Sequence, residues 1–249
     1  MHTRATRRAS LTAALILFSA ALPAAAQAED PAAEGPAGET CATSTGAGAD
    51  IQPAPDNSAA AAAAAMEQIQ AGAITLHNNA LDVDQASAYS ITTEGERFDA
   101  VTIPVAGEFS RTSNVTVVFN GAGEVVRYSE TLVDKADNGK FRVRVFNDGA
   151  QVKDETTDLD YMNDDELTAA SQVDPNQPTV TTYGVGSTVA CLAAVAGIGG
   201  PIAYLIASAC AGSCAGVATG VGAAICAACI GGYATLGAGG MTAAASCFK

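Results

Sequence analysis

Alternating polar and apolar positions predict β-strands in the middle of the chain. Residues 140–146 place an apolar side chain at every second position, which is the period of a half-buried strand. Residues 115–119 and 124–128 are rich in valine and flank an Asn-Gly-Ala-Gly segment at 120–123, a composition typical of a hairpin turn. We therefore predict an antiparallel meander of about four to six strands, with one packed face and one hydrated face. Its other predicted parts are a strand at 99–105, a turn at 147–149 and a strand at 150–153.

An alanine-rich segment before the strands predicts a helix. Asn57 or Ser58 can cap a helix over residues 59–69, because alanine has the highest helix propensity, and Gly72 provides a stop. Residues 29–56 consist mainly of Ala, Gly, Pro, Thr and acidic residues, which cannot bury enough apolar surface to offset the entropy of ordering. We predict that they form a disordered acidic leader.

Beyond residue 180 the apolar residues stop alternating and form two arms, at 189–209 and 215–236. Helix is the expected state of both arms. Gly199, Gly200 and Pro201 interrupt the first arm, and we predict a break in the helix there. The second arm carries glycines at a spacing suited to close helix packing. A helical hairpin or a small bundle follows from this pattern.

Charge divides the chain between the strands and these arms. All 26 acidic residues lie between Glu29 and Asp174, whereas residues 175–248 contain no charged residue. A uniform domain would not distribute its charge in this way, so the two parts are expected to have different solvents or partners. Residues 161–183 are acidic and polar and contain two prolines, which predicts a linker with a processing site. The net charge of −14 opposes nucleic-acid binding.

Six of the seven cysteines lie in the uncharged part. In an exported chain an even set of six predicts up to three disulfides, for which 15 pairings are possible. The Cys-x3-Cys and Cys-x2-Cys pairs are also close to the spacing of a four-cysteine zinc site or a redox motif, but their alanine-rich helical context favours disulfides. Cys41 is the odd cysteine. The six are Cys191, Cys210, Cys214, Cys226, Cys229 and Cys247.

The first 28 residues have the order of a signal peptide. Arginines at positions 4, 7 and 8 precede an apolar run at 11–22, and small residues at 24–28 provide cleavage options. The run is shorter than the roughly 20 apolar residues that a membrane anchor needs. We therefore predict a secreted protein. The paired Arg7 and Arg8 resemble a twin-arginine signal, with Sec export as the alternative.

Nothing in the sequence predicts an enzyme. His77 is the one histidine of the expected mature chain, and no nucleophile pattern lies near it. The carboxylates are scattered, and the glycines of the uncharged part lack the lysine and hydroxyl of a phosphate-binding loop. We predict no catalytic residue, no cofactor and no metal.

The order of these parts resembles a known family. An export signal, an acidic middle domain, and a final segment with Cys210-x3-Cys214 and Cys226-x2-Cys229 in Ala/Gly/Val/Ile-rich sequence are similar to the halocin-type (C-eight type) cysteine-rich bacteriocin precursors of archaea and actinobacteria. The likeness covers roughly the last 60 residues, with fewer cysteines than the archaeal prototype. It implies that proteolysis releases a C-terminal antimicrobial toxin, and that the N-terminal part acts as immunity protein or chaperone.

Together these features predict an α+β fold, in which a helix and a small antiparallel β-meander precede an apolar, disulfide-stapled helical hairpin or bundle. The expected partners are the export machinery, a processing protease, the chain's own N-terminal domain before cleavage, and finally the target-cell membrane, which the peptide permeabilises. The alternative is a cell-envelope protein whose apolar tail anchors it or self-assembles. The predicted parts are a signal peptide at 1–28, the leader at 29–56, the helix and β domain at 57–160, the linker at 161–183 and the Cys-rich toxin domain at 184–249.

Overall fold

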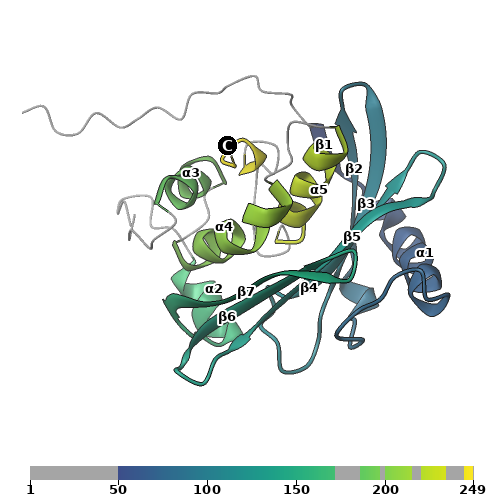
Figure 1. Cartoon of the computed structure of the whole chain (residues 1–249). Coiled ribbons are helices and arrows are strands. Elements are labelled where there is room, and N and C mark those ends of the chain that lie inside the picture. Colours follow the sequence, from purple (N-terminus) through teal and green to yellow (C-terminus); the bar gives the residue numbers. More distant parts are fainter. Residues whose placement is uncertain (1–49, 172–185, 197–199, 215–219, 234–243, 249) are drawn as a thin grey trace, which may run out of the picture. The chain divides into compact units, whose positions relative to one another are not determined.

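Each strand of the sheet pairs with the strand that follows it in the chain, giving an antiparallel meander in the order β1 to β7 (Figure 1). Helices precede and follow the meander, so the predicted α+β class is confirmed, with seven strands instead of about four to six. The computed structural model describes residues 50–171, 186–196, 200–214, 220–233 and 244–248. The strands are β1 (Asp50–Pro53), β2 (Ser87–Thr93), β3 (Glu96–Pro104), β4 (Asn114–Asn120), β5 (Val125–Lys135), β6 (Lys140–Asn147) and β7 (Ala150–Asp160).

Two-residue turns set the register of two hairpins. Asp148 and Gly149 join β6 to β7 with φ angles of 49° and 79°, and Glu94 and Gly95 join β2 to β3 with 52° and 82°. Positive φ at both central residues is the requirement of a type I′ turn, whose twist matches that of the flanking strands. The turn predicted at 147–149 therefore lies where its Asp-Gly pair indicates.

The first strand lies within the segment that the sequence assigned to the leader. Residues 50–53 pair with β2, with Asp50 opposite Thr92 and Pro53 opposite Tyr89. Ile51 is buried, and the proline is tolerated because an edge strand does not need every N–H group. One buried isoleucine is too weak a pattern to predict a strand from sequence.

A short helix, α2 (Asp164–Ala170), lies within the predicted linker. The side chain of Asn163 accepts hydrogen bonds from the N–H groups of Asp165 and Glu166, and the carboxylate of Glu166 accepts one from the N–H of Asn163. This reciprocal capping box fixes the start of the helix. Leu167 is fully buried, so the ordered part of the chain continues beyond β7.

Helices cover both faces of the sheet (Figure 1). Helix α1 packs on β2 and β3, whereas α5 packs across β2 to β5 and α4 packs on β6 and β7 from the opposite face. Helix α3 packs on α4. Each face consequently has its own buried apolar cluster. The remaining helices are α1 (Ser58–Gln70), α3 (Gly186–Ala196), α4 (Gly200–Cys214) and α5 (Gly220–Gly231), with short 3-10 turns η1 (Pro55–Asn57) and η2 (Val83–Gln85).

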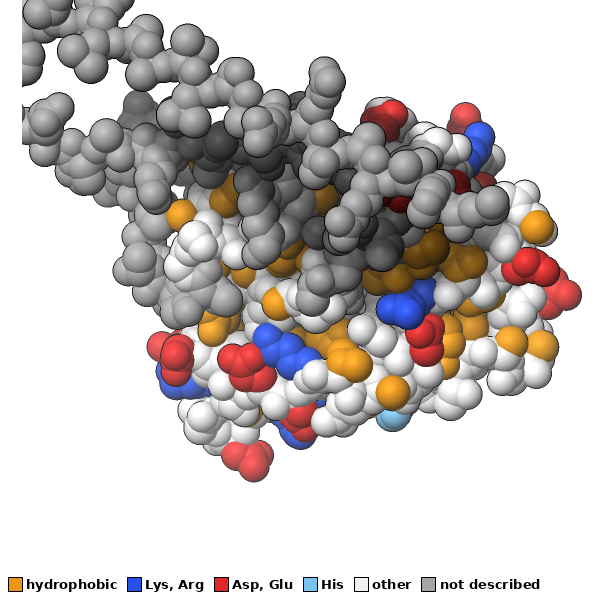
Figure 2. All heavy atoms as spheres, turned by 45° about the horizontal axis from the view of Figure 1, so that its top comes forward, with side chains coloured by type: hydrophobic (Ala, Val, Ile, Leu, Met, Phe, Trp, Pro, Cys, Tyr) orange, Lys and Arg blue, Asp and Glu red, His pale blue; other side chains and the backbone are white. Residues whose placement is uncertain are grey.

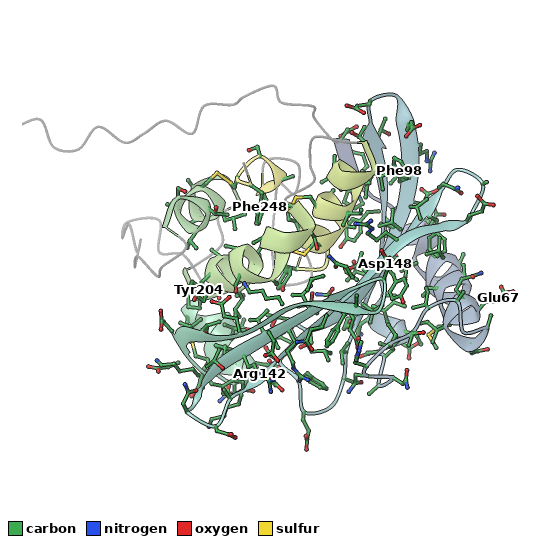
Figure 3. The ribbon with its side chains drawn as sticks, viewed as in Figure 1. Glu67, Phe98, Arg142, Asp148, Tyr204 and Phe248 are labelled. Carbon is green, nitrogen blue, oxygen red and sulfur yellow. A yellow bond between two sulfur atoms is a disulfide. The ribbon has the colours of Figure 1, made fainter. Side chains whose placement is uncertain are left out.

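The alternation in β6 decides which side chains meet the C-terminal helices. Phe141, Val143 and Val145 belong to the cluster that contains those helices. Arg142 and Arg144 point to the other side of the sheet, as Arg142 does in Figure 3, and pair there with Asp154 and Asp134. Acidic and basic side chains also lie next to one another along the lower margin of Figure 2. The sequence predicted one packed face and one hydrated face, and this is wrong in part: the other face also has a buried apolar cluster, and its charged part lies around Arg142 and Arg144.

Candidate functional site: the contact between the sheet and the C-terminal helices

All six cysteines of the C-terminal part are paired. The disulfides join Cys191 to Cys247, Cys210 to Cys229 and Cys214 to Cys226. The predicted set of three disulfides is therefore present, and it is consistent with an oxidising, extracellular environment. Because the four cysteines at the zinc-like spacing are bonded to one another, their thiolates are not available as metal ligands in this state.

Helix geometry explains two of the pairs. Cys210 and Cys214 lie four residues apart on α4, and Cys226 and Cys229 lie three residues apart on α5, so each pair shares one helix face. The inner cysteine of α4 bonds to the inner cysteine of α5, and the outer bonds to the outer. This nesting follows from an antiparallel helical hairpin. The Cys191–Cys247 disulfide then ties α3 to the C-terminal residues.

The structure places two of the three residues predicted to break the helix, Gly200 and Pro201, at the start of α4. Helix α3 ends at Ala196 and helix α4 begins at Gly200, with Pro201 in its first turn. Proline is tolerated in a first turn because the N–H group it lacks would have no helical partner there. Gly199 lies outside the described residues.

The helices of the C-terminal part are buried against the sheet rather than set apart from it. Ile202, Leu205 and Ile206 of α4 and Ile230 of α5 are at most 2% exposed. They share one apolar cluster with Ile91, Phe98, Phe141, Val143 and Leu159 of the strands. Phe98, Tyr204 and Phe248, which are labelled in Figure 3, belong to the same cluster. Helix α4 is buried along most of its length, because the sheet and the helices α2, α3 and α5 all pack on it, and only Ala211 and Gly212 are exposed.

Hydrogen bonds from both ends of the sheet cross this interface. The ammonium group of Lys153 on β7 donates to the carbonyl oxygen of Ser208 at 2.7 Å and lies 2.8 Å from its hydroxyl. The same ammonium pairs with the carboxylate of Glu155. At the other end, the hydroxyl of Tyr89 on β2 donates to the carbonyl oxygen of Gly231 at 2.7 Å. The side chain of Tyr204 on α4 also has a hydrogen bond with the backbone of Asp158 on β7, so both helices of the hairpin have polar contacts with the sheet.

Glycine at the end of α5 permits close approach to the sheet. A Cβ atom at Gly231 would lie 3.2 Å from the ring of Tyr89, and one at Gly232 would lie 3.0 Å from the amide of Asn114. Under Gly232 the sheet carries a buried polar track instead of apolar side chains. The hydroxyls of Thr102 and Thr116 lie 3.0 Å apart, Thr116 donates to Asn114, and the Asn114 amide donates to the carbonyl of Thr112.

Tyr233 follows these glycines and is fully buried. Its hydroxyl has no hydrogen-bond partner among the described residues. Burial raises the pKa of this phenol far above its ordinary value, and it also raises the pKa of Tyr89. A buried hydroxyl without a partner costs free energy, on the order of 1–3 kcal/mol. Among the described residues, the buried hydroxyl of Ser213 on α4 also lacks a partner.

The other face of the sheet holds His77, which the sequence analysis assigned no catalytic role. The N–H groups of His77 and Asn78 each donate to the buried carboxylate of Glu130 at 2.8 Å, and the imidazole Nδ1 lies 3.0 Å from the same carboxylate. The ring stacks on Phe146 with centroids 3.7 Å apart. These contacts with Glu130 hold the segment that follows α1 against β5.

Within the described part of the chain, no helix combines the length and the apolar character that a membrane crossing requires. The described residues also contain no cluster of three or more metal-ligating side chains.

Comparison with known proteins gives no relative for this chain: no family model, no curated protein and no solved structure matches it.

Proposed function

We propose that the chain is an exported precursor of a halocin-like antimicrobial peptide. The C-terminal part would be released by proteolysis and act on the membranes of competing cells, and the sheet would hold it in a water-compatible form before release. One observation carries this proposal: an uncharged helical unit, stapled by three disulfides of its own, is buried against a charged sheet through non-covalent contacts alone.

The covalent arrangement supports a separable peptide. Every disulfide joins two residues between Cys191 and Cys247, so none ties the helices to the sheet. A cut between Asp164 and Val189, the window in which we expect processing, would leave the C-terminal part with all its cross-links. Internal cross-links are what a small apolar peptide needs to keep its fold outside a larger domain.

The packing supports a holding role for the sheet. Residues such as Leu205 and Ile206 are fully buried against it, and as an isolated peptide in water they would expose a large apolar patch. Beyond Asp174 the chain carries only one charged side chain, that of Lys249, so almost all of its charge lies on the side of the sheet. Holding and immunity use the same contact, because a domain that binds the peptide also keeps it from membranes.

Intact mass spectrometry of the culture supernatant tests the proposal, with and without reduction and alkylation. We expect a fragment that begins between Asp164 and Val189, is about six hydrogens lighter than its reduced form, and kills susceptible bacteria. Full-length protein with free thiols in the membrane fraction would contradict it and favour an envelope protein with an anchoring tail.

A cysteine variant links the staples to the activity. Cys226→Ser removes the inner disulfide of the hairpin, and we expect loss of killing or of peptide accumulation. Cys41→Ser is the matched control, because it changes a cysteine outside the C-terminal part. Full killing and full accumulation by Cys226→Ser would count against the proposal.

A further inference from the structure

We infer that cutting the backbone does not by itself free the helices: the cut chain stays together as a two-fragment complex, and a lipid bilayer is the partner that takes the helices from the sheet. This inference deepens the proposed function and rests on it. It concerns the step between proteolysis and membrane attack.

The first argument concerns water. Leaving the sheet for water would expose Ile202, Leu205 and Ile206 of α4 together with their partners Phe141 and Val143 on β6. The apolar cluster that these residues share is continuous from β1 to the C-terminal Phe248, so the two fragments lose their largest common core when they separate. Leu167 of α2 also belongs to this cluster, and a cut after residue 171 leaves it on the sheet fragment.

The second argument concerns lipid. Residues 175–248 contain no charged side chain, so no buried charge opposes entry into a bilayer. Tyr233 gains from such a transfer, because its hydroxyl, which has no partner among the described residues, could reach the hydrated head groups while its ring stays in an apolar layer. A bilayer can therefore supply apolar contacts in place of those that the helices lose on leaving the sheet, whereas water cannot.

The third argument concerns what the sheet loses. Thr102, Thr116 and Asn114 form the buried polar track beneath Gly232, and these groups would be hydrated once α5 departs. A partly polar face is typical of interfaces that open and close, in contrast to those of permanent assemblies. The polar track lowers the cost of opening the contact at the end of α5.

Helix length decides how the helices would lie in the bilayer. The longest, α4, has 15 residues, and a transmembrane helix needs about 20. We therefore expect the disulfide-linked helices to lie within one leaflet, near the head groups, with the disulfides preserving their hairpin.

The test uses the full oxidised chain with a site-specific protease sequence in place of residues 174–180. After cutting, both fragments should co-elute on size exclusion in buffer. Vesicles of phosphatidylcholine and phosphatidylglycerol should then float the C-terminal fragment and leave the sheet fragment in solution. Separation or precipitation of the C-terminal fragment on cutting alone would overturn the inference, as would a complex that stays intact with excess vesicles.

Two glycine variants show whether the described contact holds the fragments together. Gly232→Val places atoms against Asn114, whereas Gly212→Val adds them where nothing lies within 4 Å. We expect Gly232→Val to raise the fraction released without lipid by about tenfold, and Gly212→Val to behave as wild type. Equal release by both variants contradicts the inference. If Gly232→Val fails to fold, Tyr89→Phe removes the hydrogen bond to Gly231 and should also increase release.

The outcome is separable from that of the proposed function. If vesicles extract the C-terminal fragment but it kills no bacteria, the inference stands and the antimicrobial proposal fails. If the fragments separate on cutting and the peptide kills, the antimicrobial proposal stands and the inference fails.

Discussion

The polar side chains that cross from the sheet to the helices are few, and Lys153 is the charged one among those described. Its ammonium reaches from β7 to Ser208 of α4 and also pairs with Glu155, with the lysine side chain only 23% exposed. Hydrogen bonds to charged groups contribute more to stability than neutral ones, particularly where little water competes. Replacing Lys153 should therefore weaken the contact between α4 and β7.

We expect Lys153→Met to lower the free energy of unfolding by about 1–3 kcal/mol, because the Ser208 carbonyl loses its charged donor. Urea unfolding followed by circular dichroism measures this. Lys140→Met is the matched control: its hydrogen bonds to Asp158 and Asp160 lie within the β6–β7 hairpin, so a loss of under about 1 kcal/mol is expected. Equal losses for the two variants would contradict the assignment.

The stability that Asp154 contributes on this face of the sheet depends on pH. Its hydrogen bonds to the Arg142 guanidinium, reinforced by Coulomb attraction, lower the pKa of the carboxyl below its ordinary value. A lowered pKa in the folded state contributes stability above the ordinary value, and this contribution is lost as the pH falls through the folded value. We expect wild type to be more stable than Asp154→Asn at neutral pH, with the difference shrinking as the pH falls below the ordinary carboxyl pKa. Thermal melts across this range would refute the pair's role if the difference persisted in acid.

At the scale of elements, the antiparallel contact of α4 and α5 organises the cross-links. The sequence separations are 56 for Cys191–Cys247, 19 for Cys210–Cys229 and 12 for Cys214–Cys226. In the chain-entropy account, a cross-link that closes a longer loop restricts the unfolded chain more. The Cys191–Cys247 disulfide should therefore contribute most to stability.

Replacing both cysteines of a disulfide by alanine should lower the free energy of unfolding by about 4 kcal/mol for Cys191–Cys247, and by about 3 kcal/mol for each of the other two disulfides. Guanidinium unfolding of the full chain, with the other two disulfides confirmed intact by mass, measures the order. If Cys191–Cys247 contributes least, local packing and not loop closure determines how much each disulfide stabilises the fold.

How much of the structure could be predicted differs between elements. The alternation in β6 and the Asp-Gly turn at 148–149 predicted the hairpin, and the alanine run predicted α1, because those signals are local. Helix α2 was missed although Asn163 and Glu166 form a capping-box pattern, since the acidic composition around it favoured a linker. Strand β1 was missed because four residues contain only one buried apolar side chain.

The helices' position on the sheet could not be derived from pattern at all. Helix α4 is apolar on every side, and the sequence of such a helix does not distinguish between lipid, other helices and a sheet as its surroundings. Likewise, nothing in the spacing of Gly231 and Gly232 indicates Tyr89 and Asn114 as their partners, which lie over a hundred residues away. The cysteine pairing was predictable only once the two helices were taken as antiparallel.

At the scale of the whole molecule, two buried tyrosines connect the contact to alkaline pH. Burial raises the pKa of Tyr89 and of Tyr233, because a phenolate is poorly solvated among apolar side chains. A raised pKa in the folded state contributes stability below the ordinary value of about 10, and this contribution is lost as the pH rises through the folded value. High pH should therefore favour detachment of the helices from the sheet.

We expect phenolate absorbance from these two groups to appear in one cooperative step above pH 10, together with a change in near-ultraviolet circular dichroism. Tyr89→Phe should reduce the amplitude of that step. Independent ionisation near pH 10, with no accompanying spectral change, would contradict the link between these tyrosines and the contact.

The nesting of the disulfides has a consequence for degradation. Because Cys191–Cys247 encloses the other two bonds, any single break in the backbone between these residues leaves both pieces covalently attached. A protease of broad specificity can nick the enclosed segment once without dividing it, whereas one break before Cys191 severs its covalent connection to the strands. If the chain is processed as proposed, covalent topology requires the separating cut to lie before Cys191.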